Sequence, residues 1–276
     1  MRVIEYPRID KITDENVILI DGPDGTKIIT LEDFRNTMLP SEMHRNIFRG
    51  NSLGTSVSVE QLEAIQSGTF DDLFIGDYWT ISGFDWEIAD MNYWLHCGDQ
   101  GQGLTSNHLV IVPRQSLYSA QMNPTNVTTG AYAGSVMRAT NLNQARTLIQ
   151  SAFPNMVLTK RAYFPNAVTS GIPSAGAWMD SIVDLMSEVN VYGTTHQRPG
   201  GNGTARNFDG ITIDRSQLSL FRLKPDTQII AAPIRTTYWL RDVVTASIFA
   251  CVSINGNASS NSASHFSGVR PCFAIG

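Results

Sequence analysis

Residues 239–276 read WLRDVVTASIFACVSINGNASSNSASHFSGVRPCFAIG. The two ends of this stretch are apolar, and its centre consists mostly of serine, asparagine, alanine and glycine. Within residues 243–276, Arg270 is the one residue with a formal charge. Short apolar runs separated by small polar residues are typical of strands joined by turns. We therefore expect this end of the chain to form short strands that carry a long polar surface.

Residues 243–276 also contain no Lys, Glu, Gln, Met or Trp. The preceding residues 209–242 contain Gln217, Lys224, Gln228 and Trp239. These five absent types are the ones that no codon ending in cytosine encodes, and three of them occur in the preceding segment. This bias is expected if asparagine codons of the form AAC had been randomised at their adenines. The alternative is a serine- and asparagine-rich loop without such a history.

The motifs WLRD at 239–242 and GVRPCF at 268–273 resemble the C-terminal end of the variable proteins of diversity-generating retroelements. GDYWTI at 76–81, HLVIVP at 108–113 and AQMN at 120–123 are similar to phage structural proteins from gut bacteria. Tyr6-Pro7 and residues 18–22 resemble the attachment end of such virion proteins. The resemblance implies an α+β fold, a C-type-lectin-like domain with two helices, many short strands and long loops.

The resemblance also implies a fixed frame and a variable ligand-binding face. The frame residues are Trp239, Arg241, Asp242, Arg270 and Pro271, and we expect Arg270 to be a buried charge that pairs with Asp242. Small polar residues with a few apolar anchors are typical of paratopes. The variable positions implied are Ile248, Cys251, Ser253, Ile254, Asn255, Asn257, Ser259, Ser260, Asn261, Ser262, His265, Phe266 and Ser267.

We expect three parts along the chain: an attachment and oligomerisation segment at 1–45, a linker at 46–57, and the lectin-like domain at 58–276 with its variable region at 243–276. The first segment contains β-prone runs on either side of DGPDG at 21–25, which predicts a hairpin. A lone hairpin is marginally stable in water. We therefore expect it to bind copies of itself, as a homotrimer, and other virion proteins.

Within the domain, Ser58 and Gln61 predict a capped helix over about 58–68. Asn141 is expected to cap a helix that ends near 153, and the apolar spacing of residues 175–190 predicts a further helix. Strands are expected at 77–81, 84–88, 109–112, 221–223, 228–231, 238–240, 247–252 and 269–275.

The composition argues against several classes of partner. A net charge of -5 is unfavourable for binding nucleic acid. No apolar run approaches the roughly 18 residues that span a membrane, so we expect no membrane insertion. The N-terminal residues lack a signal-peptide pattern, which favours a protein made in the bacterial host cytoplasm and placed on the virion surface. Three cysteines exclude a disulfide framework but leave open a single Cys251–Cys272 bridge.

The sequence gives little support for a metal site or a catalytic site. His96, Cys97 and His108 could bind zinc, but no fourth ligand is evident. A calcium site could use the acidic residues of 71–90, which lack EF-hand spacing, and we interpret them as solvated positions. These residues are Asp71, Asp72, Asp77, Asp85, Glu87 and Asp90. We expect no metal, no cofactor and no enzymatic activity.

The sequence therefore predicts a phage virion surface protein, a head or tail fibre or receptor-binding component. Its variable face would bind a host-surface protein or glycan. One alternative is a structural capsid decoration or tail protein that binds nothing. A second is an oxidase similar to the formylglycine-generating enzymes, for which Cys251 and Cys272 would have to serve as the cysteine pair.

Overall fold

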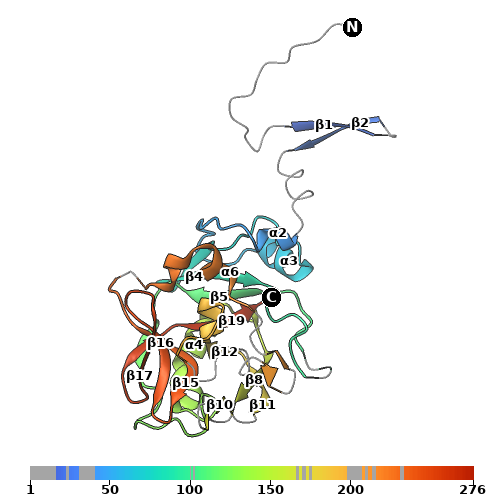
Figure 1. The fold of residues 1–276 in the computed structure, drawn as a ribbon. Coiled ribbons are helices and arrows are strands. Elements are labelled where there is room, and N and C mark those ends of the chain that lie inside the picture. Colours follow the sequence, from blue (N-terminus) through green and yellow to red (C-terminus); the bar gives the residue numbers. More distant parts are fainter. Residues whose placement is uncertain are drawn as a thin grey trace.

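Strands are more numerous than helices in this chain (Figure 1). The computed structural model describes residues 17–22, 25–30, 41–99, 101, 103–165, 168–169, 172–173, 176–197, 207–208, 211–212, 216–230 and 233–276. The expected mixture of a few helices and many short strands is confirmed in these ranges. No helix among them is long and apolar enough to cross a membrane.

The N-terminal hairpin consists of β1 (Val17–Gly22) and β2 (Gly25–Thr30), which pair in antiparallel fashion from Val17 opposite Thr30 to Gly22 opposite Gly25. This confirms the hairpin expected around residues 21–25. In Figure 1 the hairpin stands apart from the other described elements. Its side chains Val17 and Ile28 are exposed. Tyr6-Pro7 lies outside the described residues, and the attachment role of 1–45 stays a prediction.

The larger sheet has the strand order β12-β19-β5-β4-β3, with β7 also paired to β19, and all of its pairs are antiparallel. A tight turn at Ser82 and Gly83 joins β3 to β4, and both residues have positive φ, as a type I′ hairpin requires. Every residue of β5 and β19 is buried. The bounds are β3 (Tyr78–Ile81), β4 (Phe84–Met91), β5 (Leu109–Pro113), β7 (Val157–Leu158), β12 (Val183–Leu185) and β19 (Pro271–Ile275).

The second sheet has the order β17-β16-β15-β18-β6. Its pairs are antiparallel except for β15 and β18, which run parallel. The bounds are β6 (Tyr118–Ala120), β15 (Tyr238–Thr245), β16 (Ile248–Val252), β17 (Ala258–Ser262) and β18 (Ser267–Val269). Further strand pairs among the described residues are β8 (Lys160–Pro165) with β11 (Gly176–Ser181), β9 (Val168–Thr169) with β10 (Ile172–Pro173), and β13 (Asn207–Phe208) with β14 (Ile211–Thr212).

The helices are short. They are α2 (Ser41–His44), α3 (Val59–Ser67), the π-helical turn η1 (Met137–Asn141), α4 (Leu142–Ala152), α5 (Glu188–Tyr192), α6 (Ser219–Leu223) and the 3-10 turn η2 (Pro225–Gln228). The capping box of Ser58 and Gln61 before α3 is confirmed. Helix α4 lies where expected, but Asn141 does not cap it, because its side-chain amide donates to the Gln121 carbonyl at 2.8 Å.

The helix expected over residues 175–190 is wrong. Instead, β11 pairs with β8 and β12 pairs with β19, and helix begins only after Ser187, which caps α5. The apolar spacing of this segment also suits two short strands, and pairing with strands distant in sequence satisfies their backbone. The strand expected at 221–223 is wrong as well, since these residues end α6.

Residues 46–57, expected as a linker, run beside the larger sheet. The Arg49 amide donates to the Ile75 carbonyl at 2.9 Å, and the Leu53 amide donates to the Tyr78 carbonyl at 2.8 Å. Short parallel bridges join Phe48 to Ile75 and Ser52 to Tyr78. The segment is therefore held against the described body rather than spanning between two parts.

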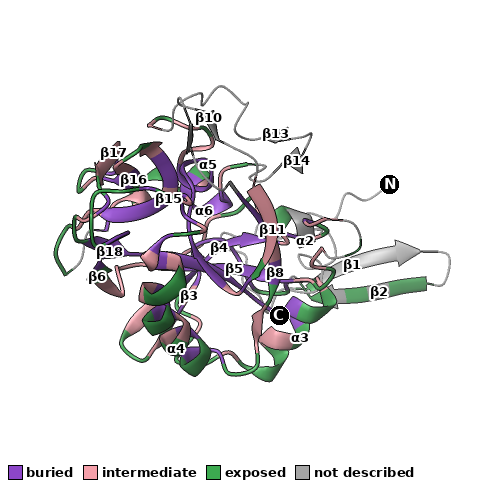
Figure 2. Cartoon of the chain, turned by 90° about the horizontal axis from the view of Figure 1, so that it is seen from below, coloured by how far each residue is buried: buried purple, intermediate pink, exposed green. Residues whose placement is uncertain are grey.

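The core includes residues of both sheets, α4 and α6, and Figure 2 shows the buried strands at the centre with exposed helix surface outside. Trp86, Phe153 and Phe273 contact one another with ring centroids 5.5–5.7 Å apart. Two of the three contacts are edge-to-face, a favourable aromatic geometry. These contacts join β4, the C-terminal end of α4 and β19 from distant parts of the sequence.

Candidate functional site

The positions implied as variable gather on and around β16 and β17 in the second sheet. Most of them reach the surface, and Ile254 and Phe266 stand out as large apolar side chains that are 47% and 63% exposed. The exposed members are Ile254, Asn255, Asn257, Ser262, His265 and Phe266. The half-buried members are Ile248, Ser253, Ser259, Ser260 and Asn261. We call these eleven residues the β17 face.

Two of the implied positions do not belong to this surface. Cys251 is buried in β16, and burial raises the pKa of its thiol to about 11. Ser267 is buried at the start of β18, where the Asn261 side chain donates to its hydroxyl at 3.3 Å. The structure corrects the expectation for both residues, because neither side chain is accessible to a ligand.

Hydrogen bonds on its inner side fix the turn before β17. The Ser253 hydroxyl accepts hydrogen bonds from the amides of Asn255 and Asn257 at 3.3 and 3.2 Å. Gly256 has a φ of +81°, and a Cβ there would lie 2.9 Å from Ile229. Tyr192 donates its hydroxyl to the Gly256 carbonyl at 2.9 Å. The turn is thus fixed on its inner side, while Ile254 projects outward.

Hydrogen bonds also fix the loop after β17. Ala263 is buried, and its carbonyl accepts from the Asn123 amide at 2.9 Å. The Asn126 side chain accepts from the Ser264 amide and hydroxyl at 3.1 and 2.6 Å. These supporting asparagines lie far from the loop in sequence, and sequence analysis missed them. They hold the segment that presents His265 and Phe266.

The frame residues support the face, but the expected pair of Arg270 and Asp242 is wrong. Arg270 is 1% exposed and donates to the carbonyls of Pro113 at 2.8 Å and Thr227 at 2.9 Å. Asp242 instead accepts from the Glu188 amide at 2.7 Å, at the start of α5. The two side chains therefore stabilise different junctions.

The other frame residues also connect elements. Trp239 is fully buried in β15, and its indole N–H donates to the Ala120 carbonyl of β6 at 2.8 Å. The Arg241 amide donates to the Met186 carbonyl at 2.9 Å. Pro271 is buried at the start of β19. The β17 face thus rests on a base whose members contact both sheets.

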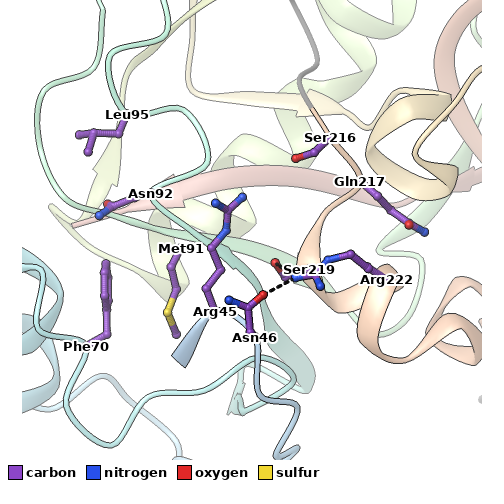
Figure 3. A pocket seen from close by; sticks show the side chains of 10 residues that line it. All are labelled: Arg45, Asn46, Phe70, Met91, Asn92, Leu95, Ser216, Gln217, Ser219 and Arg222. Atoms are coloured by element: carbon purple, nitrogen blue, oxygen red, sulfur yellow. Dashed lines mark hydrogen bonds between the residues drawn. The ribbon is translucent and has the colours of Figure 1, made fainter. Parts of the chain in front are cut away.

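A cavity of about 620 Å³ lies on another side, between the segment after α2 and α6 (Figure 3). Phe70, Met91 and Leu95 line one wall, and Arg45 and Arg222 line the other. Sequence analysis missed it, because its lining comes from segments far apart along the chain.

Both guanidinium groups of this cavity already have protein partners. Arg45 binds the buried Asp90 carboxylate, which also accepts from the Ser219 amide at 3.0 Å. Arg222 donates to the Asn46 side chain at 2.8 Å. These bonds join residues 45–46 to β4 and α6, so we place the candidate binding site on the β17 face rather than in this cavity.

The acidic residues of 71–90 are not all solvated, which corrects our interpretation. Asp77, Glu87 and Asp90 are buried. Arg49 binds Asp77 at 2.7 Å, and Arg114 lies 3.3 Å from Glu87. Burial raises the pKa of Glu87 and of Asp90, although their arginine partners oppose the shift. Arginine pairing explains why a carboxylate-rich stretch folds into the core here.

His108, one of the residues considered for zinc, has a structural role. The Nε2 atom of buried His108 accepts from the Trp94 amide at 3.1 Å, which leaves Nδ1 to donate to the Ser106 carbonyl at 3.0 Å. Both ring nitrogens are therefore occupied by backbone. Among the described residues, no three His, Cys, Asp or Glu side chains gather as a metal site. None of the three cysteines forms a disulfide, so Cys251 and Cys272 are not bridged.

His108 predicts a pH dependence of stability. Burial lowers its pKa from 6.5 to about 4. The unfolded chain therefore binds a proton that the folded chain excludes, and stability that is complete above pH 6.5 is lost as the pH falls toward 4. We expect a loss of about 3 kcal/mol over this range from this group. Urea unfolding at several pH values measures it.

The matched variant is His108→Gln, which keeps a hydrogen-bonding side chain but does not titrate. The two proteins are compared by how their stability depends on pH, and not by their stability at a single pH. The slope of unfolding free energy between pH 6.5 and 4 should be smaller than in the parent protein. Equal slopes in the two proteins would show that His108 is not the group responsible.

Comparison with protein-family models, with curated proteins and with solved structures finds no match for this chain.

Proposed function

We propose that this chain is a phage virion surface protein, a head or tail fibre or receptor-binding component, whose C-type-lectin-like domain presents the β17 face to a host-surface protein or glycan. Residues 1–45 would form a homotrimer and attach to other virion proteins. Several copies on one particle would strengthen weak single-site binding through avidity.

One observation supports this proposal most. A surface made mostly of serine and asparagine carries two exposed large apolar side chains, Ile254 and Phe266, on segments that hydrogen bonds to Tyr192 and Asn126 hold in place. Rigid apolar anchors among adaptable polar residues are the composition of binding surfaces. A few such anchors usually supply most of the binding energy. The bias in residue types over residues 243–276 supports diversification of the same surface.

An oxidase function gains no support from the cysteines. Cys251 lies in β16 and Cys272 in β19, so the two belong to different sheets. Both are buried. Burial also raises the pKa of the Cys251 thiol, which disfavours the thiolate that nucleophilic or metal chemistry requires.

The proposal predicts that Phe266→Ser and Ile254→Ser each reduce binding to intact host bacteria at least ten-fold, because each removes an exposed anchor. The unfolding midpoint in urea should change little, since both side chains are already in contact with water. Binding is measured by flow cytometry of fluorescently labelled full-length protein on a panel of gut bacterial strains.

Val59→Ser is the matched control, because Val59 is an exposed apolar residue on α3, outside the β17 face. It should bind like the parent protein. If all three variants bound equally well, the β17 face would not be the receptor site, and a structural decoration would be the better assignment.

Sequencing of the gene across its source population tests the diversification directly. We expect substitutions at adenine positions that fall on the β17 face and spare Trp239 and Arg270. Changes spread evenly along the gene would contradict the retroelement part of the proposal.

A further inference from the structure

We propose that the outer edge of β17 binds its ligand as an added strand, so that the partner is an extended polypeptide segment. This inference rests on the proposed function, because it specifies how the β17 face engages a ligand. Strand β17 is at one end of the strand order in its sheet and lies at the rim of the described body in Figure 1.

The pairing register fixes which backbone groups of β17 point outward. The Ser253 amide donates to the Asn257 carbonyl, and the Ala263 amide donates to the Ser247 carbonyl, both at 2.9 Å. In an antiparallel pair, hydrogen-bonded and non-hydrogen-bonded residue pairs alternate. With Cys251 opposite Ser259, the odd-numbered residues of β17 bond to β16.

The even-numbered residues Ala258, Ser260 and Ser262 therefore direct their amide and carbonyl groups away from the sheet. The Ser262 carbonyl accepts from the His265 amide at 2.8 Å. The outward amides of all three residues, and the carbonyls of Ala258 and Ser260, have no hydrogen bond to any described residue. They form a regular series of donors and acceptors that a neighbouring strand would satisfy.

Native sheets usually protect such an edge with charges, proline or a bulge. Strand β17, ASSNS, contains none of these residues, and its register with β16 is regular. Its ends are flanked instead by the two exposed anchors, with Ile254 in the turn before it and Phe266 in the loop after it. The edge thus carries none of these protections, and an exposed apolar side chain lies in the segment at each end of the strand.

A polypeptide fits this edge better than other ligand classes. Five residues of strand span about 17 Å at 3.4 Å per residue, so a short extended peptide would cover β17 from end to end. Main-chain hydrogen bonds would supply affinity that does not depend on side-chain identity. Diversification of Ser259, Ser260 and Asn261 could then change specificity without abolishing binding.

The test uses one position changed in two ways in the full-length protein. Ser260→Pro removes the outward amide, and proline is tolerated where an edge N–H faces solvent. Ser260→Ala removes the hydroxyl and keeps the amide. Linear octapeptides are selected from a random display library on the immobilised protein, and their affinities for both variants are measured by biolayer interferometry.

We expect Ser260→Pro to weaken the affinity for the selected peptides at least ten-fold and Ser260→Ala to change that affinity less than three-fold. In case proline perturbs folding, hydrogen exchange on the parent protein provides a second readout. The amides of Ala258, Ser260 and Ser262 should exchange quickly when free and slowly with peptide bound, whereas Ser259 and Asn261 should be protected in both states.

Failure to select any linear peptide, or unchanged exchange at Ser260 on peptide binding, would overturn the inference. Self-association of the chain that Ser260→Pro abolishes would also overturn it, since the occupant would then be a second copy. If Phe266→Ser loses binding to host cells while Ser260→Pro keeps it, the proposed function stands and the strand-addition mode falls.

Discussion

Replacing Arg270 with methionine is expected to lower the free energy of unfolding by about 4 kcal/mol, because a hydrogen bond to a charged group contributes roughly 1.5–3 kcal/mol and the change removes several of them. The guanidinium is almost fully buried and donates to the carbonyls of Pro113 and Thr227 and, at 3.3 Å, to the Tyr238 hydroxyl. Methionine fills much of the volume but leaves these acceptors without their donor. It also removes the guanidinium from the rings of Phe221 and Tyr238, whose centroids lie 5.4 and 5.2 Å away.

Urea unfolding at pH 7 measures the effect, and Arg235→Met is the control. Arg235 is exposed, so the same change there should alter stability by no more than about 0.5 kcal/mol. If both variants were equally stable, Arg270 would not be the anchor that its contacts indicate.

The position of Arg270 predicts that its replacement affects ligand binding as well as stability. The residue lies between β18, in the second sheet, and β19, in the larger sheet. Its bonds reach Pro113 of β5 and Thr227 of η2, so it ties together the segments beneath the β17 face. A surface that changes its side chains needs a base that does not move, and we expect Arg270 variants to lose binding together with stability.

Local signals in the sequence predicted local structure well. The hairpin around residues 21–25, the capping box at Ser58 and the strand at 109–112 each depend on residues close together in the chain. Positive φ at a hairpin turn and side-chain capping are short-range effects, so a single sequence carries enough information for them.

Long-range pairing could not be predicted in the same way. Residues 176–185 form strands because β8 and β19 are available as partners, and nothing near Trp178 in the sequence indicates this. Residues 221–223 became helix although their composition also suits a strand. An apolar spacing shows that one side of a short segment is buried, but tertiary partners select its conformation.

The same limit applies to the site. Composition identified the segment that carries Ile254 and Phe266, and the structure places both on the surface. It could not show that Cys251 and Ser267 turn inward, because their sides of β16 and β18 depend on how the sheet packs. The Arg270 partners were missed for a related reason, since two of them are backbone carbonyls without a residue signature.

A buried ion pair elsewhere in the fold predicts an effect of similar size. Lys160 and Asp184 are both buried, and the Lys160 ammonium donates to the Asp184 carboxylate. The Tyr132 hydroxyl donates to the same carboxylate at 3.2 Å. We expect Asp184→Asn to lower the free energy of unfolding by about 4 kcal/mol, because it leaves the ammonium buried without its counter-charge.

The double variant Lys160→Met with Asp184→Asn separates the pair from its surroundings. Removing both charges avoids an uncompensated ion, so it should recover most of the stability that the single variant loses. Urea unfolding of both variants and of Lys160→Met alone closes a double-mutant cycle. Additive losses in that cycle would show that the two side chains do not interact.

The pair of Lys160 and Asp184 also predicts how the free energy of unfolding changes at low pH. Burial alone would raise the pKa of Asp184, but the Lys160 ammonium outweighs burial and holds it below its ordinary value of 3.8. The carboxylate therefore stabilises the fold above that value, and the contribution is lost as the pH falls through the lowered pKa. His108 titrates at higher pH, so the free energy of unfolding should fall with pH in two separate ranges, one for each group. Asp184→Asn should flatten the dependence in the lower range, and His108→Gln should flatten it in the upper range, which assigns each to its residue.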